Sequence, residues 1–272
     1  MAEPASPLTD AERDAFARAF ANMALSTGQA ILEVYAGACA ARQKADASPV
    51  TEADERAETV ILTQLAAAFP QLPVIAEESV AHGVVPACGS RFILVDPLDG
   101  TREFLAHNGE FTVNIALIDR GAPIAGVVYA PALDRLWFGG ANAWTCAATP
   151  GAALPPAGDW RRISARAPEP DGLVALCSRS HGDASTEEFL AGHKIARRVN
   201  AGSSLKFCLI AEGEADVYPR FGPTMEWDIA AGEAVLRAAG GRVLTPAGEP
   251  LRYGKADEGF RNGAFVAWGR VA

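Results

Sequence analysis

The segment Phe92-Ile93-Leu94-Val95-Asp96-Pro97-Leu98-Asp99-Gly100-Thr101 leads from an apolar run directly into two aspartates three residues apart. The apolar run is typical of a buried strand. Pro97 keeps Asp96 extended at the strand end, and the following turn can return the Asp99 carboxylate to the same side. We therefore expect two acids at the end of a sheet strand, where divalent cations can bind between them.

The residues around these acids suit a phosphate site. Gly100 permits an unusual backbone angle and a close ligand approach, and Thr101 can begin a helix whose N–H groups face a phosphate. We expect the Leu98 carbonyl to be a further oxygen ligand for magnesium. Asp-Pro and Asp-Gly pairs are also common in turns, so this segment alone fits a strand and an ordinary turn equally well.

Three other acidic segments stand at predicted element ends. Glu77-Glu78 follows the short apolar run 73–76, an edge where open α/β sheets tend to bind ligands. Asp228, in Trp227-Asp228-Ile229-Ala230-Ala231-Gly232, lies at a helix start and by itself would be an N-cap. The segment 48–54, which ends in Asp54, opens another helix and by itself would be a capping segment with solvated acids.

The rest of the chain predicts alternating helices and strands in layers. Apolar spacing predicts a helix from Thr9 to about Ala41, with Asp10 as N-cap, and a second helix over 52–69. Later helices are expected over 203–212 and 227–239. Strands are expected over 73–75, 91–95, 111–118, 124–129, 173–177, 215–218, 242–244 and 265–268. The Pro-rich stretch 147–159 suggests two subdomains, 1–150 and 151–272, in one compact catalytic unit.

Composition excludes several classes of protein. The chain has 272 residues, about half of them hydrophobic, no signal-like N-terminus and no apolar run near the roughly 20 residues that span a bilayer. Its five cysteines, without metal-ligand spacing, fit reduced thiols in a cytoplasm. A net charge of −9 disfavours polymeric nucleic acid, and an acidic protein that handles phosphate needs divalent cations to neutralise its own carboxylates.

Taken together, Glu77-Glu78, the 96–101 segment and the 227–232 segment resemble the signature segments of the inositol monophosphatase superfamily, which are lithium-sensitive, Mg-dependent phosphatases. The resemblance implies an α+β layered fold (α-β-α-β-α) of the sugar-phosphatase type and two or three Mg²⁺ ions. Those ions would be held by Glu77, Asp96, the Leu98 carbonyl, Asp99 and Asp228. It also implies that Thr101, hydrogen-bonded to Asp54, orients or deprotonates the attacking water, with assistance from Glu78.

Within that superfamily the chain is most similar to the bacterial 3'(2'),5'-bisphosphate nucleotidases. The similarity lies in segments 108–117, 178–181 (Ser-Arg-Ser-His), 202–208 and 218–224. It implies that a second phosphate and an adenine are bound by His181, Ser203, Lys206 and Arg220, beside Gly100, Thr101 and Asp228. Read singly, Lys206 and Arg220 would be solvated surface charges and His181 structural. Glu226 departs from the uncharged residue expected there, so we expect it to alter the edge of the substrate pocket.

The implied reaction removes the 3'-phosphate of adenosine 3',5'-bisphosphate (PAP), giving AMP and phosphate, and extends to its sulfated relative PAPS in sulfur metabolism. The alternatives are an inositol-phosphate, histidinol-phosphate or sugar phosphatase, and a non-enzymatic metal-binding module. The expected partner is a small nucleotide, with no polymeric nucleic acid. We expect a cytoplasmic monomer or homodimer, with peripheral attachment to the inner membrane left open.

Overall fold

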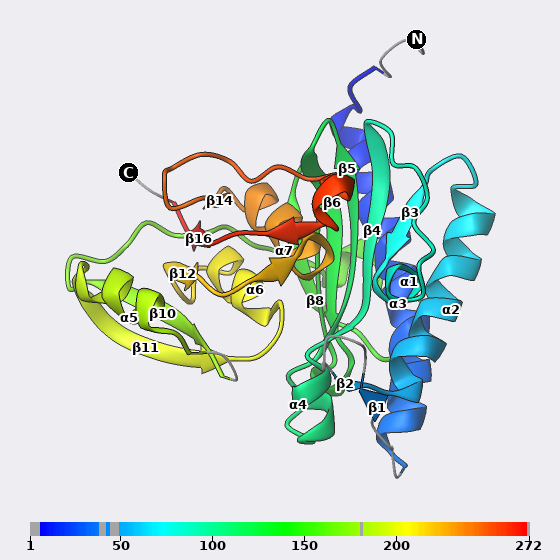
Figure 1. Ribbon diagram of the computed structural model, residues 1–272, viewed down its shortest axis with the longest axis horizontal. Helices are drawn as coiled ribbons and strands as arrows, with labels where there is room; N and C mark the ends of the chain where they lie inside the picture. The colour runs from blue at the N-terminus through cyan, green and yellow to red at the C-terminus, as the bar shows by residue number, and fades with distance from the viewer. Residues whose placement is uncertain (1–5, 38–41, 44–48, 180–181, 271–272) are drawn as a thin grey trace.

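The computed structural model describes residues 6–37, 42–43, 49–179 and 182–270, and these residues form five layers (Figure 1). Helices α1 (Asp10–Tyr35) and α2 (Glu52–Ala68) cover one face of a seven-stranded sheet. Helices α6 (Leu205–Ala211) and α7 (Glu226–Ala238) lie between that sheet and a five-stranded sheet, and α5 (Ala184–Ala191) packs on the outside. This is the α-β-α-β-α order that the family resemblance implies.

The large sheet carries the acidic segment on its second strand. Its order is β3-β4-β5-β6-β7-β8-β9, with β3 and β4 parallel and every later pair antiparallel. Its strands are β3 (Val74–Ala76), β4 (Arg91–Asp99), β5 (Thr112–Asp119), β6 (Ala122–Ala130), β7 (Arg135–Gly139), β8 (Ala143–Ala147) and β9 (Arg161–Arg162). Two five-residue helices, α3 (Glu77–Ala81) and α4 (Thr101–Leu105), follow β3 and β4 directly.

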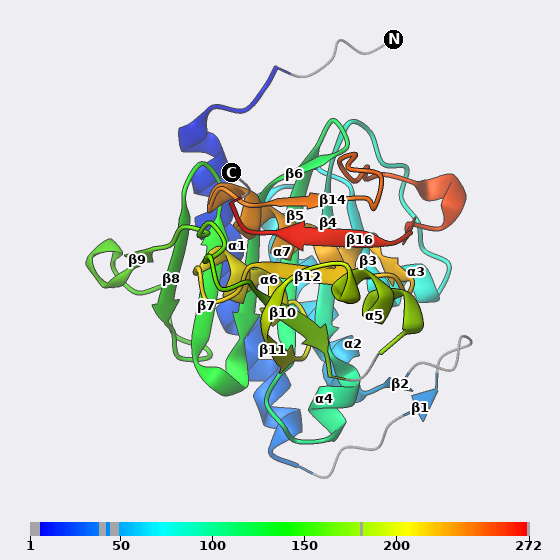
Figure 2. The ribbon, with the colours of Figure 1, turned by 90° about the vertical axis from the view of Figure 1, so that its left-hand side faces the viewer.

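The smaller sheet has the order β11-β10-β12-β16-β14 and runs across the other one when the molecule is viewed from that side (Figure 2). Its strands are β10 (Leu173–Ser178), β11 (Ile195–Ala201), β12 (Val217–Arg220), β14 (Arg242–Leu244) and β16 (Phe265–Trp268). Two ribbons pair β1 (Arg42–Gln43) with β2 (Pro49–Val50) and β13 (Thr224–Met225) with β15 (Arg261–Asn262). The large sheet continues beyond residue 150 to β9, and the subdomain boundary stays a prediction.

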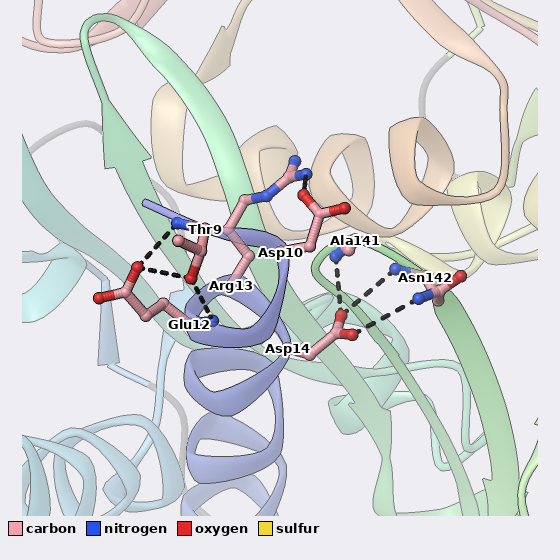
Figure 3. A network of polar contacts seen from close by, with 7 residues as sticks. All are labelled: Thr9, Asp10, Glu12, Arg13, Asp14, Ala141 and Asn142. Atoms are coloured by element: carbon pink, nitrogen blue, oxygen red, sulfur yellow. Dashed lines mark hydrogen bonds and ion pairs between the residues drawn. The ribbon is translucent and has the colours of Figure 1, made fainter. Parts of the chain in front are cut away.

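The N-terminus of α1 is fixed by its own residues and by the β7–β8 turn (Figure 3). Thr9, not Asp10 as predicted, is the N-cap, because its hydroxyl accepts from the Glu12 N–H while Glu12 accepts from the Thr9 N–H. Asp10 instead pairs with Arg13. Asp14 accepts hydrogen bonds from the backbone N–H groups of Ala141 and Asn142, at 2.7 and 3.3 Å. The helix ends at Tyr35, six residues earlier than expected.

Helix α7 lies close against the large sheet because the contact residues are small. A Cβ at Gly126, on β6, would lie 2.9 Å from the Ala234 Cβ and 3.1 Å from the Ala231 Cα. A Cβ at Gly232, on the same helix, would overlap the Phe207 ring at 2.5 Å. Side chains larger than these would push the helix outward. The small residues after Asp228 therefore set how far its carboxylate stands from the end of β4.

Among the described residues, three apolar cores hold the layers together. One lies under α1 and α2, another surrounds α6 and α7 between the sheets, and a third, smaller one packs α5 on the small sheet. The four cysteines that the structure describes are free thiols: Cys88, Cys146, Cys177 and Cys208. Across the described part of the chain, we find no helix with the length and apolar character that crossing a membrane requires.

Candidate active site

A pocket of about 280 Å³ opens where α4, α6 and α7 begin and β12 ends. Eight of the residues predicted from the sequence line it: Glu77, Asp99, Gly100, Thr101, Ser203, Lys206, Arg220 and Asp228. Asp54, Glu78, Asp96 and Leu98 are 2–4% exposed and are absent from the described residues that line it. His181 lies outside the described residues. The structure thus gathers residues from both halves of the chain around one pocket.

The two aspartates of the 92–101 segment are brought to one face by a β-bulge, not by the turn expected after Pro97. Asp96 pairs with Asn114 and Asp99 with Thr112, so two residues of β4 oppose Val113 alone. Acids three residues apart in a regular strand point to opposite faces, and the extra residue reverses this. Pro97 suits the bulge because it has no N–H to give to the ladder. The Asp96 carboxylate accepts from the Leu98 N–H at 3.0 Å.

Gly100 and Thr101 behave as the sequence predicts. Gly100 has a φ of +91°, and a Cβ there would lie 3.2 Å from the Glu110 carbonyl and 3.3 Å from the Ser203 Cβ. Thr101 is the first residue of α4, and its hydroxyl donates to Asp54 Oδ1 at 3.3 Å. The other Asp54 oxygen accepts from the N–H and hydroxyl of Thr51, which holds the carboxylate in place at the start of α2.

Asp228 stands among other acids. Its Oδ2 accepts from the Met225 N–H at 2.8 Å, as the third residue of α7 and not as its N-cap. Burial, together with the negative charges of Asp99 and Glu77, raises the pKa of Asp228 well above its ordinary value. Such crowding of carboxylates is relieved by a bound cation.

The residues around the pocket fit a divalent metal in their donor chemistry. Three carboxylates repel one another across it, and hard oxygen donors suit Mg²⁺ or a similar ion. In the described part of the chain, no three His, Cys, Asp or Glu side chains converge as a ready-made ligand cluster.

Asp99 is oriented by two serines from the other half of the chain. Its Oδ2 accepts from the hydroxyls of Ser203, at 2.6 Å, and Ser204, at 2.9 Å. Ser203 also contacts the Thr112 hydroxyl, beside Asp99 in the strand pairing. Because these donors occupy one oxygen, the other is the one available to a cation. Ser204 is a site residue that sequence reasoning missed, and its signal was the doubled serine before α6.

Lys206 and Arg220 both line the pocket but differ in setting. Lys206 is 4% exposed and donates to the carbonyls of Ala201 and Ser203, at 3.2 and 2.6 Å, so it is not the solvated charge of the alternative reading. Burial lowers its pKa to about 8. The Arg220 Nε has no hydrogen-bond partner, although it is buried. An anion in the pocket would supply one.

Glu226 does not alter the edge of the pocket, which corrects the expectation from the sequence. It is fully buried and absent from the described pocket lining. Its carboxylate accepts from the backbone N–H groups of Gly254 and Lys255, at 2.7 and 2.9 Å, and pairs with the Lys255 ammonium at 2.8 Å. The charge is therefore used to fasten segment 252–262 to α7.

Glu58 is another buried acid that the sequence reasoning missed. It accepts from the N–H groups of Glu78 and Ser79, both at 2.8 Å, and so fixes the start of α3, where Glu77 faces the pocket. Asp54 and Glu58 precede Ile61 and Leu65 of the buried α2 face by two turns each. Acids at this spacing, on the buried face of a helix, were the sequence feature that could have identified Glu58 as a buried residue.

The layered arrangement and the acidic pocket at the end of β4 define a member of the sugar-phosphatase fold class. The chain belongs to the inositol monophosphatase family, which matches residues 12–266. The predicted family and fold are thereby confirmed. The family is divalent-metal dependent.

Individual relatives agree with this assignment. The chain is 46% identical to the 3'(2'),5'-bisphosphate nucleotidase CysQ of Escherichia coli K12, over 89% of this chain and 95% of the relative. Its fold matches the crystal structure of CysQ from Bacteroides thetaiotaomicron with a TM-score of 0.79 and 38% identity, covering 95% and 98% of the two chains. An inositol monophosphatase from Anabaena is 25% identical, with a TM-score of 0.71 and coverage of 94% and 90%.

Proposed function

We propose that this protein is a 3'(2'),5'-bisphosphate nucleotidase that hydrolyses the 3'-phosphate of PAP to give AMP and inorganic phosphate. The observation that carries the proposal is the 46% identity to a bisphosphate nucleotidase over nearly the whole of both chains. The pocket supports it, because carboxylates lie beside Lys206 and Arg220, and the second phosphate of such a nucleotide needs cationic donors away from the metals.

The metal we propose is Mg²⁺, as two or three ions held by Glu77, Asp96, Asp99, Asp228 and the Leu98 carbonyl. When bound, Mg²⁺ supplies neutralisation of phosphoryl charge and acidification of an attacking water. The chain's own residues do the rest. Thr101 would orient the water, Asp54 accepts a hydrogen bond from the Thr101 hydroxyl, and the buried Glu78 would assist.

Substrate selection is assigned to a different set of residues. Gly100 leaves room for the scissile phosphate next to the α4 N–H groups, while Lys206 and Arg220 attract the distal phosphate. The Ser203 hydroxyl donates to Asp99 and also contacts the Thr112 hydroxyl, and from this position at the pocket Ser203 would contact the nucleotide. His181 completes the proposed set. Activity on PAPS, the sulfated relative of PAP, is part of the same proposal.

The test is a panel of substrates under one set of conditions. Phosphate release is measured from PAP, PAPS, inositol 1-phosphate, histidinol phosphate and a sugar phosphate, with Mg²⁺, with Mg²⁺ and Li⁺, and with EDTA. We expect PAP to be preferred and turnover to need Mg²⁺ and to be inhibited by Li⁺. Preference for a substrate with a single phosphate would show that this compound, and not PAP, is the substrate. A protein that binds Mg²⁺ but releases no phosphate from any of the compounds would refute the enzyme assignment.

A further inference from the structure

An ion pair beside the pocket is unexplained by the proposed chemistry. Arg179 lies one residue after β10, and its Nε and one terminal nitrogen donate to the two carboxylate oxygens of Glu110 at 2.9 and 2.7 Å. The Arg179 and Glu110 side chains are 44% and 22% exposed. Two-point pairing of this kind fixes the orientation of a carboxylate as well as its position.

The Glu110 carboxylate, oriented in this way, binds the backbone of the turn before α6. Its Oε2 accepts from the Gly202 N–H at 2.7 Å. Burial would raise the pKa of Glu110, but the hydrogen bonds from Arg179 and Gly202 outweigh it and keep that pKa below its ordinary value. Glu110 therefore stays an ionised acceptor at neutral pH.

The turn itself has little freedom. A Cβ at Gly202 would lie 2.8 Å from the Glu103 Cγ and 2.9 Å from the Glu110 carbonyl, so only glycine fits there without movement. Ser203 has a φ of +50°, a conformation that a side chain rarely adopts without support. The hydrogen bond at Gly202 is immediately next to this residue and helps to maintain it.

We propose that Arg179 and Glu110 are positioning residues that set the Ser203 turn and, through its hydroxyl, the orientation of the metal-binding carboxylate of Asp99. Each link is a direct contact: Arg179 with Glu110, Glu110 with Gly202, and Ser203 with Asp99. The inference rests on the proposed function, because it assigns these residues to the same site.

Direct contact with substrate explains Arg179 less well. Arg179 is absent from the described residues that line the pocket, whereas Lys206 and Arg220 are present. Its donors already face Glu110 and the Asn200 carbonyl, the latter at 3.3 Å. Substituting Arg179 should therefore weaken Mg²⁺ binding more than it weakens binding of the nucleotide.

The experiment measures Mg²⁺ binding to the full-length protein by calorimetry, with no nucleotide present. Arg179→Gln and Glu110→Ala are expected to weaken Mg²⁺ affinity about tenfold, the lower end of the effect of residues behind the ligands. Arg179→Lys should recover part of the loss. Arg198→Gln is the matched control. The Arg198 side chain has the same 44% exposure and forms an ion pair of 2.6 Å with Glu187, and neither residue is among the described residues that line the pocket.

A double-mutant cycle with Ser203→Ala tests the route of the effect. If Arg179 acts through the Ser203 turn, Arg179→Gln should change Mg²⁺ affinity by less than twofold once the Ser203 hydroxyl is gone. Thermal unfolding in EDTA reports whether each variant is folded, and Arg179→Lys keeps the test usable if the glutamine variant is not. At saturating Mg²⁺ the KM for PAP should stay within about twofold of wild type.

Three results would overturn the inference. One is unchanged Mg²⁺ affinity with a raised KM for PAP, which would make Arg179 a substrate contact. Another is a loss of affinity no larger than that of Arg198→Gln, and the third is full additivity with Ser203→Ala. A protein that binds Mg²⁺ but releases no phosphate from PAP would instead refute the proposed function, and the Mg²⁺ titrations could still be interpreted.

Discussion

The hydroxyl of Thr101 donates to Asp54 Oδ1 across 3.3 Å, which joins the start of α4 to the first turn of α2. Asp54 is 2% exposed, so this contact links a buried base to a residue of the pocket wall. We predict that Thr101→Ala lowers kcat by about 10²–10⁴-fold, the usual contribution of a positioned acid–base group. Mg²⁺ affinity, measured by calorimetry, should change little.

Thr101→Ser is the control for that prediction, because it keeps the hydroxyl. It should retain most of the activity. Asp99→Asn should abolish turnover through the opposite route, by weakening Mg²⁺ binding itself. Near-normal activity of Asp99→Asn would show that the proposed metal ligands are wrong.

The crowded acids give a second prediction, on stability. Since burial, Asp99 and Glu77 all raise the pKa of Asp228, its charged form opposes folding when no cation is bound. Asp228→Asn should therefore raise Tm in EDTA. Adding Mg²⁺ at 100 times its Kd should stabilise the wild type by about 2.7 kcal/mol, whereas the variant should gain much less. A lower Tm for Asp228→Asn in EDTA would contradict this reading of the pocket.

Local patterns predicted most of the fold but missed several strands and helices, including β7 and β8 inside the large sheet. The strands 91–95, 111–118 and 124–129 have apolar runs because both faces of the sheet are covered. β11 was missed, since it lies at the edge of its sheet and most of its residues, including Arg197 and Arg198, face solvent. α5 was missed for a similar reason, because only Leu190 of its residues is buried.

The candidate site, too, was predicted only in part. Acids at the ends of strands and helices were found because each stands beside an apolar run that predicts its element. The groups that orient them were not, because the contacts join distant parts of the chain, as with Ser204 and Asp99 or Glu58 and Glu78. Glu226 was misjudged for the same reason, since its partner Lys255 comes from a loop that no local pattern connects to α7.

The pairing of Glu226 with Lys255 gives a prediction about stability rather than specificity. Removing one partner of a buried ion pair leaves the other uncompensated, at a cost of about 3–5 kcal/mol. Glu226→Ala should therefore lower Tm by roughly 6–20 °C. The order of substrates in the phosphate-release panel should not change. Glu187→Gln, at an exposed ion pair, should leave Tm nearly unaltered. A changed substrate order in a folded Glu226 variant would restore its assignment to the pocket edge.

Glu233, seven residues further along α7, predicts how stability depends on pH. It is 1% exposed, and burial raises its pKa from 4.5 to about 7 despite the hydrogen bond from Tyr253 and the charge of Arg237. Because the folded pKa lies above the unfolded one, the folded protein binds more protons in this interval. The free energy of unfolding should therefore fall as pH rises from about 4.5 to 7, and this residue should contribute about 3 kcal/mol to the fall.

Glu233→Gln removes this titration while keeping an oxygen that can accept from Tyr253. Its free energy of unfolding, from urea denaturation in EDTA, should exceed that of the wild type by a margin that grows from pH 5 to pH 8. The comparison with the wild type at each pH cancels the titration of the other acids, which both proteins share. A margin that stayed constant over this range would mean that Glu233 is ionised throughout, with Arg237 and Lys255 offsetting its burial.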